Sequence, residues 1–260
     1  MNMKLLQRLT VAVFILVLAA YAGLNFYTYR YVDRTPPIIT CGSDVVEVRV
    51  GAPDSELLRD VTAHDDVDGD ISDQIMIKGV SQLITADTAK ITYLVMDSSN
   101  NMTTASRTVR YTNYEKPRFE LTTPLIYSLS SNIRLLDRLR ASDRVDGDIS
   151  HNIRVTTQNV DPSRSGVYSV TVQVSNSLGD VETLPLRLLL TDGLRPAVTL
   201  TKYIVYISAG SAFSPENYIL SPADRSGVEI SSNVDTSTPG VYEVSYTHST
   251  GTVFLAVVVR

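Results

Sequence analysis

The stretch Asp66-Val67-Asp68-Gly69-Asp70-Ile71-Ser72 returns further along the chain as Arg144-Val145-Asp146-Gly147-Asp148-Ile149-Ser150. A second segment of the later copy, Gly166-Val167-Tyr168, returns in turn as Gly240-Val241-Tyr242. Self-similarity of this kind indicates an array of similar small domains rather than one large core. Three segments of the chain are therefore expected to be copies of one unit, the third of them shorter and altered.

Prolines mark the expected start of each copy. Pro36-Pro37, Pro117 and Pro196 each lie in a turn-like stretch that contains charged residues. Proline fixes φ and cannot donate to a β-ladder, so it suits a linker or the beginning of an edge strand. The boundaries predicted on this basis give three domains, at residues 36–114, 115–194 and 195–260.

Apolar and polar residues alternate within each copy. In the first copy Val46, Val48 and Val50 are separated by Glu47 and Arg49, and similar runs recur in the second and third. A period of two is typical of strands with one face on a core. Turn-forming residues interrupt the runs at short intervals, which predicts about seven short strands per copy and an immunoglobulin-like β-sandwich.

The N-terminal region predicts a membrane anchor. No charged residue lies between Leu9 and Tyr29, and as a helix this segment spans roughly 31 Å, enough for a bilayer core. Lys4 and Arg8 precede it, and positive charge favours the cytoplasmic side. We expect residues 1–8 in the cytoplasm, residues 9–29 across the membrane in a single pass, and the C-terminal repeats outside the cell.

The predicted fold class is therefore all-β: three tandem immunoglobulin-like β-sandwiches after one N-terminal transmembrane helix. A cleaved signal peptide is the alternative for the N-terminal segment, because Ala20-Tyr21-Ala22 has the small-x-small pattern of a cleavage site. The apolar stretch continues past that site, which favours the anchor. Both alternatives export everything after residue 30.

Composition and motifs exclude several classes of function. The net charge is -5, and no cluster of Lys and Arg offers the basic surface that nucleic acid requires. Cys41 is the single cysteine, so an intrachain disulfide is not possible. The sequence contains no Gly-x-Ser-x-Gly elbow, no Gly-rich phosphate loop and no His-Glu-x-x-His pair. We expect that the protein is not an enzyme.

A resemblance to a known family can be stated on these motifs. The pattern Asp-x-x-Asp-Gly-Asp-Ile-Ser, with a later Gly-x-Tyr strand and a short turn, resembles the bacterial surface Ig-like repeat, also described as the pesticidal-crystal-protein-type Ig-like domain. The resemblance covers roughly residues 36–260. The first copy departs from it at Asp87-Thr88-Ala89, and the third at Ser226-Gly227-Val228-Glu229. The family implies an immunoglobulin-like sandwich on a surface or secreted protein, a spacer or adhesion role, and no catalytic activity.

The aspartates of the repeated stretch have two interpretations. An extended backbone places Asp66, Asp68 and Asp70 on one face, where their carboxylates would form a Ca²⁺ site. The other interpretation is a structural turn, in which aspartate caps backbone amides and Gly69 takes a positive φ. In the second copy Arg144 replaces Asp66, so an internal salt bridge would supply the positive charge. The turn is favoured, and Ca²⁺ is the one cofactor that the residues suggest.

These observations predict a membrane-anchored, extracytoplasmic repeat protein with a structural, adhesive or protein-binding role. The expected partners are the membrane itself and another surface protein or a glycan, with no nucleic acid. Two alternatives stay open at this point: a glycan- or cell-wall-binding module, and an accessory subunit of a membrane-associated assembly.

Overall fold

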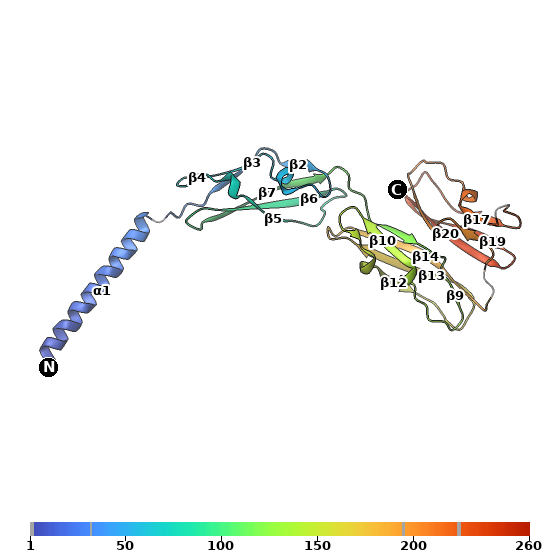
Figure 1. Ribbon diagram of the computed structural model, residues 1–260, viewed down its shortest axis with the longest axis horizontal. Helices are drawn as coiled ribbons and strands as arrows, with labels where there is room; N and C mark the ends of the chain where they lie inside the picture. Colours follow the sequence, from blue (N-terminus) through green and yellow to red (C-terminus); the bar gives the residue numbers. More distant parts are fainter. Residues whose placement is uncertain (1–2, 32, 194–195, 223–224) are drawn as a thin grey trace. The chain divides into compact units, whose positions relative to one another are not determined.

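The structure is a computed structural model that describes residues 3–31, 33–193, 196–222 and 225–260. It consists of one long N-terminal helix followed by strands (Figure 1). By its contacts the chain divides into two compact units. The first compact unit comprises Met1–Val48, Ala52–Ser81 and Thr88–Arg110, and the second comprises Arg49–Gly51, Gln82–Asp87 and Tyr111–Arg260.

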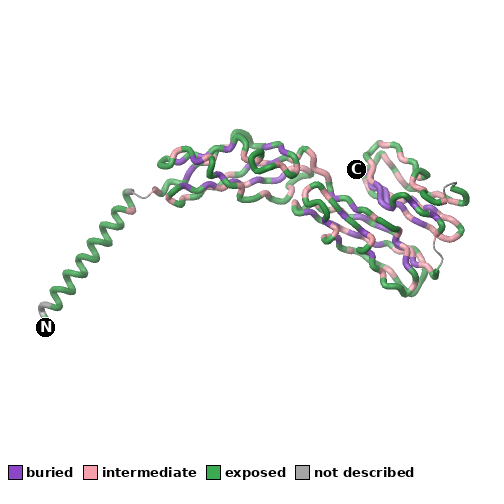
Figure 2. Tube along the Cα trace, viewed as in Figure 1, coloured by how far each residue is buried: buried purple, intermediate pink, exposed green. Residues whose placement is uncertain are grey.

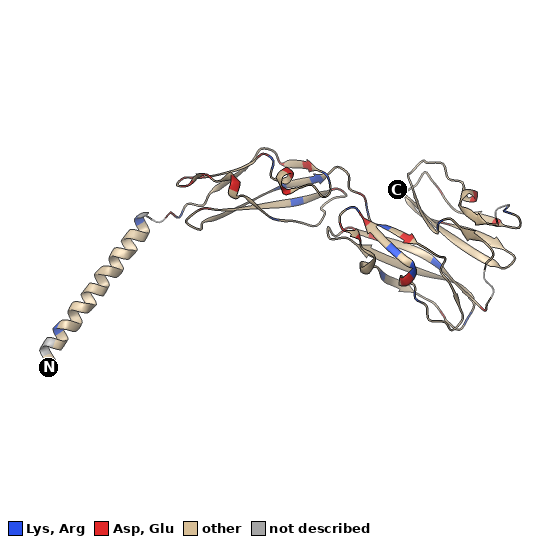
Figure 3. Cartoon of the chain, in the orientation of Figure 1, with Lys and Arg blue, Asp and Glu red and all other residues tan. Residues whose placement is uncertain are grey.

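The N-terminal helix α1 (Met3–Tyr31) is long and apolar enough to cross a membrane. None of its candidate span, Leu6–Arg30, is buried against the rest of the chain, and Figure 2 shows the helix exposed along its length. Its charges lie near the two ends (Figure 3). Apolar side chains exposed over some 25 residues are what a helix in lipid presents.

The first compact unit contains one sandwich of two sheets. One sheet has the order β1–β3–β4 and the other the order β2–β7–β6–β5. The strands are β1 (Ile38–Cys41), β2 (Val45–Val48), β3 (Val61–Asp65), β4 (Gly69–Asp70), β5 (Met76–Val80), β6 (Thr88–Met96) and β7 (Met102–Tyr111). Short helices α2 (Asp54–Leu57) and η1 (Ser72–Gln74) connect them. Ile91, Tyr93 and Val95 of β6 are fully buried, as their alternation predicts.

The second compact unit contains two further sandwiches. The sheets of the second sandwich have the orders β11–β10–β8 and β12–β13–β14–β9, and those of the third have the orders β15–β17 and β16–β20–β19–β18. The second sandwich is built from β8 (Arg118–Leu121), β9 (Ile126–Ser128), η2 (Leu136–Arg138), β10 (Leu139–Asp143), β11 (Gly147–Asp148), η3 (Ser150–Asn152), β12 (Arg154–Gln158), β13 (Gly166–Ser175) and β14 (Val181–Thr191). The third is built from β15 (Thr199–Leu200), β16 (Ile204–Ile207), η4 (Pro215–Tyr218), β17 (Ile219–Ser221), β18 (Glu229–Ser232), β19 (Gly240–His248) and β20 (Gly251–Val259).

The predicted fold class is confirmed. Each sandwich is built around one long antiparallel hairpin, β6–β7, β13–β14 or β19–β20. Among the described residues, the smaller sheet of the third sandwich has two strands where the others have three. The third copy lacks the aspartate–glycine pair that forms the β3–β4 and β10–β11 turns of the others. The predicted boundaries of the three domains stay predictions.

The second and third sandwiches share buried surface. Ile204, Ala256 and Val258 of the third sandwich belong to the hydrophobic cluster that fills the second. Conversely, Leu121 and Ile126 of the second pack against the cluster of the third. The second compact unit is therefore two sandwiches with one continuous apolar contact, which the repeat pattern alone did not predict.

Candidate functional site

The three predicted site residues, Asp66, Asp68 and Asp70, lie in different surroundings. Asp66 is exposed. The Asp68 carboxylate accepts hydrogen bonds from the backbone N–H of Ser98 at 2.7 Å and from its hydroxyl at 2.8 Å. The Asp70 carboxylate accepts the N–H of Ser72 at 3.0 Å and the hydroxyl of the same residue. The Ca²⁺ site predicted on these three residues stays a prediction.

Asp65, immediately before them, organises the turn. Its Oδ1 accepts the N–H groups of Val67 and Asp68, each at 2.9 Å, and Gly69 has φ +77°. These N–H groups, first that of Asp68 and then that of Val67, lower the pKa of the Asp65 carboxyl because they stabilise its charged form. Local hydrogen bonding and a left-handed glycine are what a turn between β3 and β4 requires.

The second sandwich repeats the backbone hydrogen bonds of this turn. Asp143 Oδ1 accepts the N–H groups of Val145 and Asp146, and Asp146 accepts the N–H and hydroxyl of Ser177. In the first copy the Ser72 hydroxyl oxygen accepts the N–H of Ala63 at 3.0 Å, and in the second Ser150 does the same for Ala141 at 3.0 Å. The repeated stretch is therefore explained by the needs of the fold.

Arg144 forms a salt bridge within the second copy, and its partner is Glu115 rather than an aspartate of the turn. Its guanidinium pairs with Glu115, with Nε 2.9 Å from Oε1. Glu115 lies in the segment before β8 and also pairs with Arg118 at 3.0 Å. Arg144 thus links the turn to the segment before β8, the first strand of its sandwich. The carboxylates of Asp143 and Asp146 accept hydrogen bonds from neutral donors instead.

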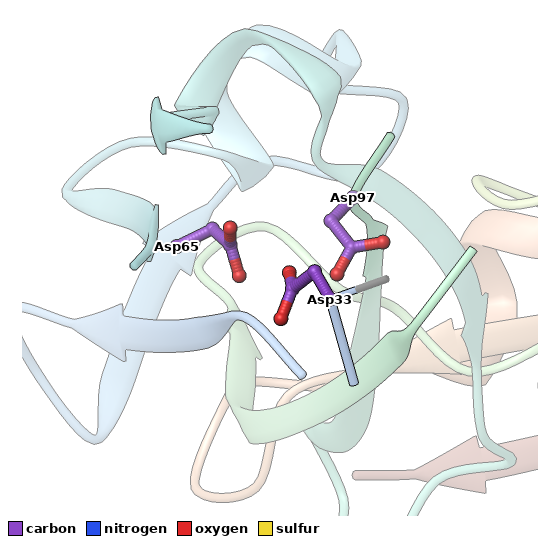
Figure 4. Close-up of side chains that lie close together, drawn as sticks. All are labelled: Asp33, Asp65 and Asp97. Carbon is purple, nitrogen blue, oxygen red and sulfur yellow. The ribbon is translucent and has the colours of Figure 1, made fainter. Parts of the chain in front are cut away.

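Three other carboxylates do converge. Among the described residues, Asp33, Asp65 and Asp97 form a group with one carboxylate oxygen each, and these oxygens lie within 4.8 Å of one another. Asp65 is 2 % exposed and Asp97 is 3 % exposed, while Asp33 is half-buried. Figure 4 shows the three carboxyl groups turned toward a common space. They come from three places: the segment after α1, the end of β3 and the turn between β6 and β7.

Sequence reasoning missed Asp33 and Asp97. Asp97 opens the stretch Asp97-Ser98-Ser99-Asn100-Asn101, whose composition predicts only a turn. Asp33 follows the apolar segment, and in the sequence it is noticeable only as a negative charge that partly offsets Arg34. One signal was available in the repeat alignment: Asn176 stands in the second copy where the first has Asp97, next to a serine in both.

A cleft is the other feature with the character of a site. It lies between the second and third sandwiches, inside the second compact unit, and has a volume of about 250 Å³. Its walls include Pro185, Arg187, Asn233, Tyr242 and Glu243. Arg187 Nε pairs with Glu243 Oε2 at 2.8 Å across the cleft. Most of the residues that line it are apolar, with a few polar groups among them, which is the composition of small-molecule sites.

Comparisons with known proteins relate part of the chain to larger proteins. No family model matches the sequence. Pesticidal crystal protein Cry22Aa of Bacillus thuringiensis is 38% identical over 118 residues, which are 42% of this chain and 16% of that protein. An uncharacterized 81.3 kDa protein of Acholeplasma phage L2 is 25% identical over 167 residues, 59% of this chain and 22% of that protein. The chain thus spans less than a quarter of either relative.

Solved structures resemble the fold only loosely. The CBM51-2 and INT domains of Clostridium perfringens ZmpB, solved in complex with GlcNAc, match with a TM-score of 0.24 and 18% identity, over 57% of this chain and 26% of that chain. Drosophila N-cadherin EC1-3 matches with a TM-score of 0.26 and 17% identity, over 72% of this chain and 88% of that chain. Together with the sequence similarity to Cry22Aa, the sheets described above make this a β-sandwich repeat protein.

Proposed function

We propose that this chain is a single-pass membrane protein whose immunoglobulin-like repeats, of the bacterial surface kind, stand outside the cell and act by binding. The observation that carries the proposal is α1. No residue in the described part of the chain buries its apolar surface, and hydrocarbon is the environment that stabilises such a surface. Sandwiches follow it after a short linker, and loops at the ends of sandwiches are common places for binding surfaces.

The anchor is tested by membrane fractionation of the expressing cell. The full chain is expected to stay with membranes after a high-pH carbonate wash, and deletion of residues 3–31 is expected to release essentially all of it, because about 20 apolar residues hold a protein in a bilayer. Protease added to intact cells should digest the repeats of the full chain. A mature protein that begins at Gly23 would instead establish a cleaved signal peptide and contradict the anchor.

The cleft in the second compact unit favours a second candidate, binding of a cell-wall glycan. Tyr242 contributes a half-buried ring to the wall while its hydroxyl donates to Thr238 O at 2.9 Å. A ring fixed in this way offers a face to a sugar, and the Arg187–Glu243 pair offers charged hydrogen-bonding groups beside it.

This candidate predicts a specific loss. Glu243→Gln is expected to weaken binding of soluble peptidoglycan fragments to the full chain about tenfold, the loss of roughly one charge-assisted hydrogen bond. Glu47→Gln is the matched control, since Glu47 forms a similar exposed pair with Arg110 at 2.9 Å outside the cleft. Binding is measured by calorimetry. If the wild type does not bind the fragments, or if the two variants bind them equally well, the cleft is ruled out as a glycan site.

A further inference from the structure

We propose that Asp33, Asp65 and Asp97 bind one divalent cation with the preferences of Ca²⁺, and that this ion fastens the segment after the membrane helix to the first sandwich. The site is separate from the Asp66, Asp68 and Asp70 set that the sequence suggests. It goes beyond the binding role proposed above and does not depend on it.

The charges of the three residues call for a counter-ion. Among the described residues, no lysine or arginine forms an ion pair with any of them. Backbone N–H groups of Ser99 and Asn101 donate to Asp97 Oδ1 at 2.9 and 2.7 Å, and the Asn101 side-chain amide donates to Asp97 Oδ2 at 2.7 Å. Backbone N–H groups of Val67 and Asp68 donate to Asp65 Oδ1. These donors are all neutral, and a group of carboxylates with little exposure is stabilised when an opposite charge or a metal ion lies beside it.

One oxygen of the group lacks any protein partner. Asp65 Oδ2 is buried and has no hydrogen-bond partner in the described part of the chain. The other carboxylate oxygen, Oδ1, accepts the N–H groups of Val67 and Asp68 in the turn. An unsatisfied buried carboxylate oxygen costs free energy comparable to the loss of a hydrogen bond to a charged group. A bound cation at the place where Asp33 and Asp97 meet removes that cost.

The second sandwich is an internal control for this argument. There the corresponding oxygen, Asp143 Oδ2, accepts the side-chain amide of Asn176 at 2.8 Å. The same amide also donates to the hydroxyl oxygen of Tyr114 at 2.9 Å, and that hydroxyl donates to Asp180 Oδ2 at 2.7 Å. Tyr114 lies four residues before the start of β8 and Asp33 five residues before the start of β1, so the two side chains come from the same linker but not from the same aligned position.

The two copies therefore solve the same local problem differently. The second copy places the Asn176 amide, a neutral donor, against its half-buried Asp143, and the Tyr114 hydroxyl accepts from the same amide. The first copy has the Asp97 carboxylate at the place of that amide, with the Asp33 carboxylate near it, and an ionised carboxylate can only accept. Replacing the donor to the turn aspartate with an acceptor makes sense if a cation lies between the carboxylates.

The ligand atoms indicate the class of ion. All three are carboxylate oxygens, and no histidine or cysteine joins the group. Oxygens bound to one Ca²⁺ at about 2.3–2.6 Å lie at most about 5 Å apart, which fits a group within 4.8 Å. The half-buried position of Asp33 leaves room for water to complete the coordination. Zinc prefers nitrogen and sulfur, and Mg²⁺ keeps most of its water.

The ion would hold the chain at a particular place. Asp33 belongs to the short linker between α1 and β1, and the side chain of Asn101 donates to its carbonyl oxygen at 3.3 Å. This hydrogen bond joins the linker residue to the β6–β7 turn, and its donor–acceptor distance is long. Coordination by Asp33 would add a strong, Ca²⁺-dependent tie at the same point.

The test compares hydrogen exchange in the full chain, held in detergent micelles, in CaCl₂ and in EDTA. The amides of Val67, Asp68, Ser99 and Asn101, which donate to Asp65 and Asp97, are expected to exchange at least about tenfold more slowly in millimolar Ca²⁺. The first compact unit should also melt about 5–10 °C higher when free Ca²⁺ exceeds its Kd about tenfold.

Two variants decide the assignment. Asp97→Asn, which restores the asparagine of the second copy, should abolish the Ca²⁺ effect and slow exchange in EDTA, because the new amide can donate to Asp65. Asp66→Asn removes the same charge from an exposed position and should keep the full Ca²⁺ effect. The proposal is overturned if wild type shows no Ca²⁺ effect, if Asp97→Asn keeps it, or if Asp66→Asn loses it.

Discussion

Replacement of Arg107 by alanine is expected to destabilise the first compact unit by about 3 kcal/mol. Arg107 lies on β7 and is only 5 % exposed. Its Nε donates to the Tyr93 hydroxyl oxygen at 2.8 Å, and its Nη2 donates to the carbonyl oxygens of Leu57 and Arg59 at 3.0 and 2.8 Å. The guanidinium carbon also lies 5.5 Å from the centre of the Tyr93 ring. Alanine would leave the Arg59 carbonyl without this donor and open a cavity.

The measurement is hydrogen exchange of the β6 and β7 amides in the full chain, converted to a free energy of opening. Arg110→Ala is the matched control. Arg110 lies three residues further along β7, and its pair with Glu47 at 2.9 Å is exposed, so a cost below about 1 kcal/mol is expected. Equal effects of the two variants would mean that the buried hydrogen bonds of Arg107 contribute nothing beyond those of a surface arginine.

The second large effect is expected at the contact between the second and third sandwiches. Arg260→Ala should lower the stability of the second compact unit by about 2–3 kcal/mol. The Arg260 Nη2 pairs with Glu182 Oε1 at 2.9 Å and donates to the carbonyl oxygen of Pro117 at 2.8 Å. Glu182 is only 12 % exposed, and the variant would leave its charge without this partner.

Arg260 also packs on a half-buried tyrosine. Its guanidinium carbon lies 4.5 Å from the centre of the Tyr206 ring, and the Tyr206 hydroxyl oxygen accepts the N–H of Phe119 at 2.7 Å. Burial raises the pKa of Tyr206 to about 12, so this hydroxyl stays neutral at physiological pH. The contact therefore joins a strand of the third sandwich to the first strand of the second.

Chemical denaturation of the full chain, with Arg187→Ala as the control, checks this expectation. The Arg187–Glu243 pair also joins the two sandwiches, at 2.8 Å, but its side chains are 41% and 36% exposed. Surface pairs of that kind contribute about 1 kcal/mol or less. A double variant with Glu182→Ala should cost less than the sum of the single changes if the pair interacts directly.

The strands could be predicted because their residues carry the signal locally. Val46 and Val48 of β2 are buried on one face of a strand, and their spacing of two is visible without any knowledge of the partner strands. The third sandwich was also predictable, since Gly240-Val241-Tyr242 copies the start of β13 at the start of β19. A period of two indicates which face is buried, whatever surface covers that face.

The parts that could not be predicted depend on residues far apart in sequence. Asp33 and Asp97 meet only because β1 and the β6–β7 turn lie at the same end of the first sandwich, so no local spacing reveals them. Arg107 occupies the position that Leu186 and Leu255 fill in the other hairpins. A charge there contradicts the apolar pattern, and only the carbonyl groups and the tyrosine around it explain its burial.

The contrast between Asp97 and Asn176 has a consequence for how such repeats diverge. Codons for aspartate and asparagine differ only at their first base, so a point mutation converts one side chain into the other. A single substitution can therefore convert a polar network that is complete within the domain into one that depends on a bound cation. No intermediate sequence that fails to fold is needed. In an array of copies, each domain can acquire this substitution separately. The stability of some domains then depends on cation concentration, while that of their neighbours does not.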